Sequence, residues 1–467
     1  MSRRPRIVVV GAGISGLTAA YRLRHTHDVC VLESGERVGG KIQTEESGGL
    51  LLEWGPDSLV AHKPAGERLC RELGLGDRLL GLNSGGSRMQ VVVDGRLHQV
   101  PEGFLMIAPT RLVPLITTSL LSPLGRARAA LERWIPARRE QGDESLQRFV
   151  TRRWGREVYE HVAEPVLGGL FAADATRLSA RACVPRMLAM ESKYGNVAAG
   201  LSRMRAAHGA EQRPRVAVYA LEGGMSVLVD TLAERLPQDA VRLRTTVRDL
   251  QRSGSGWCVT LDGGETLDAD AVVLACPAFV ASRLLESNAP ELAAKLDAVE
   301  YASCATVNLL YDASAVGTAL QGFGFFVARS EDSPLLACNY TSLKFAGRAP
   351  LGCVMLRAFL GGAGRASLSG VEDGQLVQMA HEALAALLDL RGAPRFGRAR
   401  RFVNALPQPV VGITEVRERL AQGLPNLALC GSACGILGLP DCIESAENAA
   451  QRLTAALERP EGFERVG

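Results

Sequence analysis

The stretch RIVVVGAGISG, residues 6–16, decides the fold of this chain. Its first five residues are mostly β-branched, as in a strand buried inside a parallel sheet. The three glycines that follow have separate roles: the first permits a tight turn, the second lets the backbone approach a pyrophosphate, and the third lets a helix pack against the strand. A helical pattern comes next, so a helix N-terminus with free N–H groups faces the phosphates. The stretch predicts a βαβ unit that binds a dinucleotide through Gly11, Ala12, Gly13, Ile14, Ser15 and Gly16.

The segment after the second strand distinguishes between dinucleotides. Glu33 ends the apolar run at 29–32, about 20 residues beyond the glycines, where an acid takes the ribose hydroxyls and repels the 2′-phosphate of NADP. Residues 37–44, RVGGKIQT, resemble the R-x-G-G-x-x-x-T segment of amine-oxidase and phytoene-desaturase flavoproteins. Arg37 can neutralise a pyrophosphate, and Gly39-Gly40 lets the chain pass close to a cofactor. We therefore predict FAD rather than NAD.

A second glycine-rich turn, near the C-terminal end, completes the predicted flavin site. Residues 429–443 read as a strand, a turn and the start of a helix, whose N-terminus would point at the flavin pyrimidine. Both chain ends therefore build one domain. We predict an α/β (α+β) fold like that of amine oxidases and p-hydroxybenzoate hydroxylase, with a Rossmann-type FAD-binding domain, a mixed-sheet substrate domain and an inserted helical lobe. The predicted bounds are 1–86, 214–282 and 405–467 for the FAD-binding domain, 87–104 and 283–404 for the substrate-binding domain, and 105–213 for the helical lobe.

Composition excludes several other classes of protein. The chain has 467 residues, of which 47% are apolar, and a formal net charge of +3. It can therefore fill more than one core, and it has no dedicated nucleic-acid surface. Eleven cysteines without a CxxC pair fit free thiols in a reducing compartment. Because no leader, membrane span or metal-spaced His/Cys cluster is visible, we expect a cytoplasmic protein without a metal site.

Segments spread over the whole chain carry a more specific resemblance. They are KIQT at 41–44, GPDS at 55–58, LHQVPEG at 97–103, EP at 164–165, EGGM at 222–225 and GLPDCI at 438–443. Together they resemble the oxygen-dependent porphyrinogen oxidases of haem synthesis, a family that includes protoporphyrinogen oxidase and its coproporphyrinogen III-oxidising relatives. The first three segments are most similar to the soluble bacterial branch of that family.

The resemblance implies FAD contacts residue by residue. Val247 would meet the adenine through its backbone, although an ordinary core valine competes closely with that interpretation. Cys434 could in principle carry a covalent flavin, but a buried free thiol fits that position better. The other implied cofactor contacts are Gly11 to Gly16, Glu33, Ser34, Arg37, Gly40, Lys41, Gly55, Pro56, Asp57, Ser58, Ser432, Leu437, Gly438 and Leu439.

The resemblance also implies a largely apolar pocket for the macrocycle, with cations for its propionates. For the aromatic residues of this pocket, core packing is an equally good interpretation. Among basic residues Lys63 is preferred as the propionate partner, with a solvated surface lysine as the alternative. Arg88 stands beside Met89, where protoporphyrinogen oxidases often have an arginine. The implied pocket residues are Lys63, Arg88, Gly169, Ala172, Phe326, Asn339 and Phe359.

The activity implied by the resemblance is a six-electron oxidation of protoporphyrinogen IX or coproporphyrinogen III, in three rounds, with O2 as acceptor and peroxide as product. No catalytic side chain is predicted, because flavin N5 accepts the hydride of a substrate that gains aromaticity. The alternatives are an amine oxidase or a carotenoid desaturase of the same fold. The absence of Tyr or Trp around residues 435–437 counts against an amine oxidase. A flavin-stabilised carrier that only hands on porphyrin is a further alternative.

The predicted helical lobe leaves its partner open. Apolar residues and arginines between 104 and 139 could meet anionic lipid on the inner face of the membrane, or form a solvated face over the substrate channel. Handover of the porphyrin to a ferrochelatase is also expected from the resemblance. A monomer and a homodimer fit the sequence equally well.

Overall fold

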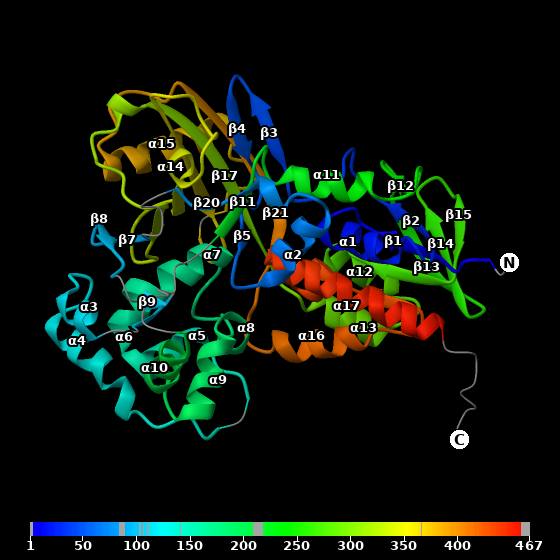
Figure 1. Cartoon of the computed structure of the whole chain (residues 1–467), viewed down its shortest axis with the longest axis horizontal. Coiled ribbons are helices and arrows are strands. Elements are labelled where there is room, and N and C mark those ends of the chain that lie inside the picture. Colours follow the sequence, from blue (N-terminus) through cyan, green and yellow to red (C-terminus); the bar gives the residue numbers. More distant parts are fainter. Residues whose placement is uncertain are drawn as a thin grey trace.

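A five-stranded parallel sheet forms the centre of the part shown on the right of Figure 1. The computed structural model describes residues 3–83, 89–101, 104–105, 107–109, 112–140, 142–208, 218–365 and 367–458. The strands are buried on both faces, as the continuous apolar runs predict. In sheet order they are β12 (Val241–Arg242), β2 (Asp28–Leu32), β1 (Arg6–Val10), β16 (Ala271–Leu274) and β22 (Leu427–Leu429).

Helices cover one face of this sheet and a small antiparallel sheet with further helices covers the other. The first face packs α1 (Ile14–Leu23), α2 (Pro64–Glu72), α11 (Ser226–Glu234) and α17 (Leu439–Leu457) into one apolar cluster. The second packs β13 (Val247–Ser253), β14 (Gly256–Leu261), β15 (Thr266–Ala269), α12 (Ala278–Leu285), α13 (Pro290–Asp297) and α16 (Ile413–Gln422). This part, which the sequence predicts to bind FAD and which is called the FAD-binding part below, is built from segments near both ends of the described chain and from a central piece.

The packing places one boundary differently from the sequence-based division. α13 lies beyond residue 282, yet its residues Ala293 and Leu296 belong to the apolar cluster under the parallel sheet. The connection to the next sheet comes at Val299, where β17 is about to begin. A helix of eight residues without a strand before it gives no signal of which core it joins.

A mixed seven-stranded sheet forms the upper left part of Figure 1. One face packs against α15 (Asp373–Leu388), which lies across the sheet and buries Leu376, Ala380 and Leu384. The opposite, inner face meets both the helical lobe and the FAD-binding part. In sheet order the strands are β21 (Phe396–Pro407), β17 (Tyr301–Asp312), β20 (Cys353–Gly361), β19 (Leu335–Tyr340), β18 (Gly324–Val327), β7 (Gln90–Val93) and β8 (Arg96–Gln99).

Short strands join the FAD-binding part to this sheet. The hairpin of β3 (Thr44–Ser47) and β4 (Leu50–Glu53) leads into the GPDS segment. A three-stranded sheet follows, in which β11 (Val218–Leu221) pairs with β5 (Leu59–Val60) and β6 (Leu79–Leu80). The short helix α14 (Thr341–Lys344) then connects β19 towards β20.

The helical lobe lies at the lower left of Figure 1. Its described part contains two-residue strands β9 (Phe104–Leu105) and β10 (Ala108–Pro109), and otherwise helices. The wide π-helical segment Tyr159–Gly168 accommodates Pro165, which cannot donate a backbone hydrogen bond. The helices are α3 (Leu112–Thr117), α4 (Pro123–Ala130), α5 (Leu146–Trp154), α6 (Arg156–Val158), α7 (Gly169–Phe171), α8 (Ala180–Cys183), α9 (Pro185–Tyr194) and α10 (Val197–His208).

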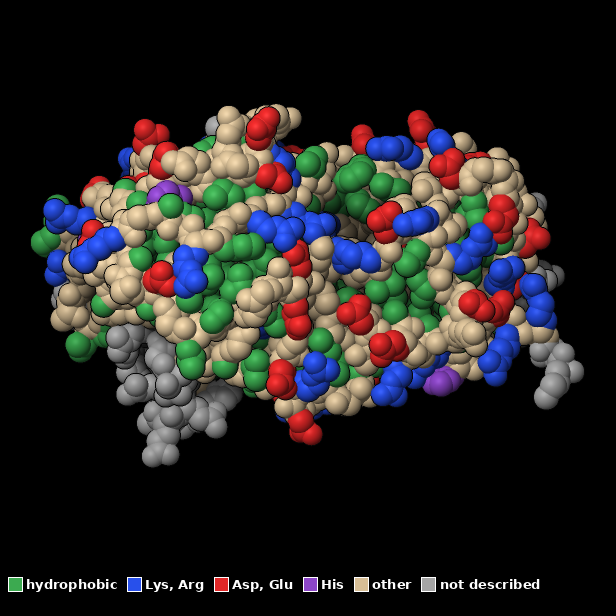
Figure 2. All heavy atoms as spheres, turned by 90° about the horizontal axis from the view of Figure 1, so that it is seen from above, with side chains coloured by type: hydrophobic (Ala, Val, Ile, Leu, Met, Phe, Trp, Pro, Cys, Tyr) green, Lys and Arg blue, Asp and Glu red, His purple; other side chains and the backbone are tan. Residues whose placement is uncertain are grey.

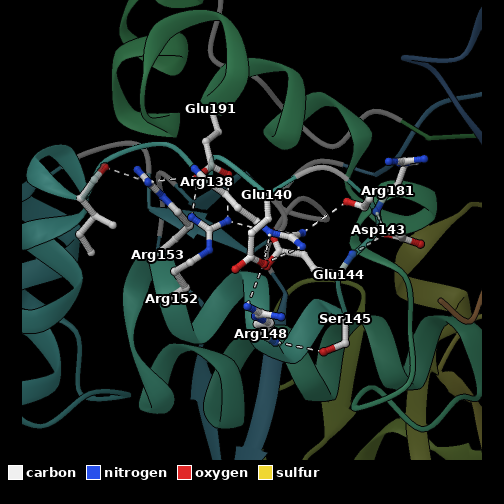
Figure 3. Close-up of polar contacts among 12 residues, drawn as sticks. Arg138, Glu140, Asp143, Glu144, Ser145, Arg148, Arg152, Arg153, Arg181 and Glu191 are labelled. Atoms are coloured by element: carbon white, nitrogen blue, oxygen red, sulfur yellow. Dashed lines mark hydrogen bonds and ion pairs between the residues drawn. The ribbon is translucent and has the colours of Figure 1, made fainter. Parts of the chain in front are cut away.

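Ion pairs on α5 hold this lobe together (Figure 3). Arg153 is fully buried and donates to the carboxylate of Glu132, with its Nε 2.8 Å from Glu132 Oε1. The neighbouring Arg152 bridges Glu144 at 2.8 Å and Glu191 at 2.6 Å. Because buried charges are stable only when paired, this network fixes the loop before α5 and the last turn of α9.

No helix in the described part of the chain is long and apolar enough to cross a membrane. All eleven cysteines are free, as predicted.

Candidate functional site

The glycine loop joins β1 to α1 at the carboxyl end of the parallel sheet. Gly11 has φ +103°, and its N–H donates to the carbonyl of Leu32 at 2.8 Å. A Cβ at Gly16 would lie 1.8 Å from the Gly11 oxygen, so this position requires glycine for helix–strand contact. A Cβ at Gly13 would meet no chain atom within 4 Å. The second glycine therefore borders open space, whereas the first and third shape the chain itself.

The predicted ribose acid is held beside this loop. Glu33 accepts hydrogen bonds from the N–H groups of Ala12 and Gly35, both at 2.8 Å, and from the hydroxyl of Ser34 at 3.4 Å. The segment before β13 runs alongside, because Thr245 N–H donates to the Glu33 carbonyl at 2.8 Å. Val247 follows two residues later. The structure thus brings Glu33, Ser34 and the start of β13 together at one end of the sheet.

The Arg37 guanidinium, predicted to neutralise a pyrophosphate, bonds mainly to backbone carbonyls of its own loop. Its terminal nitrogens donate to the carbonyls of Val38 at 2.8 Å, Ile42 at 2.9 Å and Gly40 at 2.7 Å. These bonds fold residues 38–42 into a loop that passes the glycine turn, where Gly39 N–H donates to the Ala12 carbonyl. Arg37 therefore shapes the cradle wall, and little of its guanidinium remains for a phosphate.

Lys41 places a partly buried positive charge at the same site. Its Nζ lies 3.4 Å from Ser432 Oγ and contacts no carboxylate among the described residues. Burial lowers the pKa of this lysine. Ser432 is in turn fixed by Tyr301, whose hydroxyl donates to the Ser432 carbonyl at 2.6 Å. An ammonium buried in this way is stabilised by an anion.

Two helix N-termini converge on this ammonium. Ser15 in α1 donates to the Cys442 carbonyl in α17 at 3.3 Å, so the first turns of these two helices touch. Neither N-cap, Gly13 or Gly438, supplies a side-chain hydrogen bond to its helix. Leu437 and Leu439 flank Gly438. The free N–H groups and the partial positive charge of both helices therefore face the same space.

These residues fit FAD. The open space over Gly13, two uncapped helix N-termini and a buried ammonium together suit a pyrophosphate, and Glu33 suits a ribose. Burial raises the pKa of the Cys434 thiol to about 12, which suits a free thiol rather than a covalent link. Figure 2 shows a hollow near the middle of one face, with Lys and Arg side chains beside it.

The GPDS segment lies against this cradle from the other side. A Cβ at Gly55 would lie 1.8 Å from the Lys41 oxygen, so the two backbones are in contact there. Pro56 follows, and then Asp57 turns inward and receives Lys344 Nζ at 2.9 and 3.0 Å and Ser58 Oγ at 2.7 Å. Burial opposes ionisation of Asp57, but Lys344 and Arg357 overcome it and hold its pKa well below the ordinary value.

Three predicted pocket residues share the inner face of the seven-stranded sheet. Phe326 on β18 is opposite Ala337 on β19, which is opposite Phe359 on β20, and Asn339 lies two residues along β19. In each of these otherwise buried strands the predicted residue is partly exposed. Asn339 also donates to Asp57 at 3.4 Å. The three side chains therefore lie on one face of the sheet, and Asn339 reaches the GPDS segment.

The helical lobe packs against Phe326 on the seven-stranded sheet. A Cβ at Gly169 would lie 2.5 Å from Phe326 Cδ1, so glycine is needed for the contact. Ala172 takes a left-handed conformation with φ +48°, and its carbonyl accepts from Ala363 N–H at 2.8 Å. Both residues thus lie where α7 meets the sheet.

Of the two basic residues predicted to bind propionates, Lys63 and Arg88, the structure describes only Lys63. Lys63 precedes α2 and forms an ion pair with Asp441 at 2.5 Å, with 42% of its side chain exposed. A propionate would therefore compete with Asp441 for this lysine. Arg88 lies outside the described residues. His98 and His161 bond Ser119 Oγ and the Leu120 carbonyl respectively, away from the flavin cradle.

With this geometry, comparison with known proteins defines the class. The family model described as flavin containing amine oxidoreductase matches residues 14–454, and the chain belongs to this family. It is an FAD-dependent oxidoreductase with the fold of that family.

Three relatives narrow the comparison. The chain is 33% identical to the coproporphyrinogen III oxidase of Bacillus subtilis (strain 168), over 96% of this chain and 97% of that protein. It is 26% identical to protoporphyrinogen oxidase 2, chloroplastic/mitochondrial, of Arabidopsis thaliana, over 97% and 94%. A crystal structure from Exiguobacterium sp. 255-15, provisionally described as a protoporphyrinogen oxidase, superposes with a TM-score of 0.85 at 30% identity, covering 98% of this chain and 100% of that one.

Sequence reasoning missed Lys344, Arg357 and Tyr301. Arg357 stands alone in the apolar run 354–360 of β20 and is only 2% exposed. A single charge inside a buried strand is a signal that could have identified it. Lys344 and Tyr301 have no such signal, because each depends on a contact with a segment far away in the chain.

Proposed function

We propose that this protein oxidises a porphyrinogen to the porphyrin in haem biosynthesis, with coproporphyrinogen III as substrate and O2 as electron acceptor. The observation that carries the proposal is the inner face of the seven-stranded sheet. Phe326, Asn339 and Phe359 are partly exposed there, and Asn339 contacts Asp57 of the GPDS segment. The near full-length similarity to coproporphyrinogen III oxidases supports the choice of substrate.

The chain's own residues bind and orient in this proposal. Aromatic side chains contact the faces of a flat macrocycle, and Gly169 keeps the contact between the lobe and Phe326 close. When bound, FAD supplies the two-electron oxidation, which is repeated three times for a porphyrinogen. The buried strands and the lobe keep water from the space, which limits side reactions.

Aerobic oxidation of coproporphyrinogen III and protoporphyrinogen IX, measured side by side by porphyrin fluorescence, tests the proposal. Faster oxidation of coproporphyrinogen III is expected. A preference for protoporphyrinogen IX would keep the class and change the substrate. Oxidation of neither by protein with bound FAD would reject porphyrinogen oxidation, and an amine or carotenoid would be tried next.

We further propose that the helical lobe contacts anionic membrane from the cytoplasmic side. Val113, Leu124 and Trp134, all in the helical lobe, expose 70%, 82% and 68% of their surface. Arg133 lies over the Trp134 ring at 5.2 Å. Apolar side chains beside arginines suit an anionic interface. Flotation with anionic vesicles tests this: loss of binding in Trp134→Ala is expected, and no co-flotation of the unaltered protein rejects it.

The product supports a third proposal, that porphyrin passes directly to a ferrochelatase. A chelatase consumes the aromatic macrocycle that the oxidation yields. Transfer to a chelatase in the presence of excess porphyrin-binding albumin is expected to proceed if the two proteins meet. Complete interception by albumin would reject direct handover.

A further inference from the structure

Five charged side chains are buried together where the GPDS segment meets the seven-stranded sheet. Glu53 and Asp57 come from the FAD-binding part, and Lys344, Arg348 and Arg357 come from α14, the loop after it and β20. None of them is more than 8% exposed. The cluster holds three cations and two carboxylates, so at least one positive charge is in excess.

Two of these cations hold the GPDS segment, Arg357 through backbone carbonyls and Lys344 through the Asp57 side chain. Arg357 Nη2 donates to the carbonyls of Trp54, at 2.9 Å, and of Gly55. Lys344 holds the Asp57 carboxylate with both oxygens. The Nε of Arg357 is buried and has no hydrogen-bond partner, so hydrogen bonding within the protein leaves part of this guanidinium unused. Arg357 is therefore held in place by the segment, and its positive charge can still act on a group bound beside it.

The cluster adjoins the flavin cradle through one continuous set of contacts. Arg357 touches Gly55, Gly55 packs on Lys41, and Lys41 reaches Ser432 at the start of the second glycine turn. In a dry interior, charge is screened much less than at a surface. An excess cation here therefore acts on a bound flavin more strongly than any exposed residue.

Burying such a cluster has a large desolvation cost, which apolar residues of similar volume would avoid. We propose that Lys344 and Arg357 are positioning residues for the flavin. They fix the Trp54–Ser58 segment beside the cofactor cradle, and their excess positive charge would favour the reduced, more negative cofactor. The inference rests on FAD binding and is independent of which porphyrinogen is oxidised.

The sign of the effect separates this role from a purely structural one. Lys344→Met removes a positive charge and is expected to lower the midpoint potential of the bound flavin by about 30 mV, which is tenfold in the equilibrium constant of a two-electron couple. Asp57→Asn removes a negative charge and is expected to raise the potential. The double variant restores the charge balance and is expected to return close to the unaltered value.

The potential is measured on purified holoprotein by slow reduction beside a reference dye. Arg152→Met is the matched control, since it removes a cation from the ionic network of the helical lobe. It is expected to lower the melting temperature without moving the potential. If Lys344→Met does not fold, the midpoint potential of Asp57→Asn tests the proposal by itself. A lower or unchanged potential in Asp57→Asn overturns the proposal. Equal shifts in Arg152→Met and Lys344→Met also overturn it.

Discussion

Replacing two glycines of the same loop by alanine should damage the protein in two different ways. Gly13 has φ −72° and ψ 178°, which alanine adopts freely, and its added Cβ would meet no chain atom within 4 Å. The added Cβ of Gly16→Ala would lie 1.8 Å from the Gly11 oxygen and 3.3 Å from Ala275 Cβ. The first change fills space outside the chain, and the second pushes α1 away from the sheet.

The magnitudes follow from these contacts. Without FAD, Gly13→Ala should leave the free energy of unfolding within about 1 kcal/mol of the original, with a small gain because alanine restricts the unfolded chain. Gly16→Ala should lose roughly 1–3 kcal/mol or more through overpacking. With FAD, the Gly13 methyl displaces the pyrophosphate from the N–H groups of α1. Losing one charge-assisted hydrogen bond costs up to about 3 kcal/mol, or roughly 150-fold in Kd.

The assay uses protein stripped of FAD. Denaturant unfolding gives the stability of each apoprotein, and quenching of flavin fluorescence gives the Kd for FAD. The expected pattern is a stable Gly13→Ala apoprotein that binds FAD weakly and a Gly16→Ala apoprotein that is already destabilised. An unchanged Kd in Gly13→Ala would refute the placement of the pyrophosphate over Gly13.

Three other changes have outcomes set by single contacts. Arg153→Met leaves Glu132 buried without its cation and should lower the free energy of unfolding by about 3–5 kcal/mol. The same change at Arg148, in an exposed pair, should lower it by at most about 1 kcal/mol. Thermal unfolding compares the two variants, and equal losses of stability would contradict the burial argument. Burial raises the pKa of Glu53 to about 7, above its ordinary 4.5, so the folded protein keeps a proton that the unfolded chain releases between these values. Stability should fall as pH rises through this range, and Glu53→Gln should flatten the slope in denaturant titrations; an unchanged slope would exclude Glu53 as its source. Phe359→Ala should raise KM for the porphyrinogen and leave the flavin absorption spectrum unaltered, and an unchanged KM would place the macrocycle elsewhere.

The sequence predicted the parts of the fold that depend on local patterns. The strand at 6–10, the glycine turn and the helix after it follow from apolar periodicity and turn residues, and the structure has them. The resemblance to a porphyrinogen oxidase family also agrees with the comparisons. The assignment of individual FAD and substrate residues stays a prediction.

The parts that could not be predicted depend on contacts between distant segments. Lys344 and Asp57 are 287 positions apart, and neither position shows its partner. Arg37 looked like a phosphate ligand because its charge is visible in the sequence, whereas the carbonyls that occupy it depend on how residues 38–42 turn. α13 packs on α12, which directly precedes it, and on α16, which comes more than a hundred residues later and could not be recognised as its partner from the sequence.

The dependence of the parallel sheet on β22 has a consequence for synthesis on the ribosome. β1 and α1 are made about 400 residues before β22 and α17, which complete the sheet and the cofactor cradle and lie at 427–429 and 439–457. At about 5–20 residues per second, the N-terminal strands wait tens of seconds for these partners. During that time the apolar surface of α1 that packs on α17 is uncovered. Nascent chains should therefore need chaperone protection until α17 emerges, and FAD can stabilise the protein only once α17 is in place.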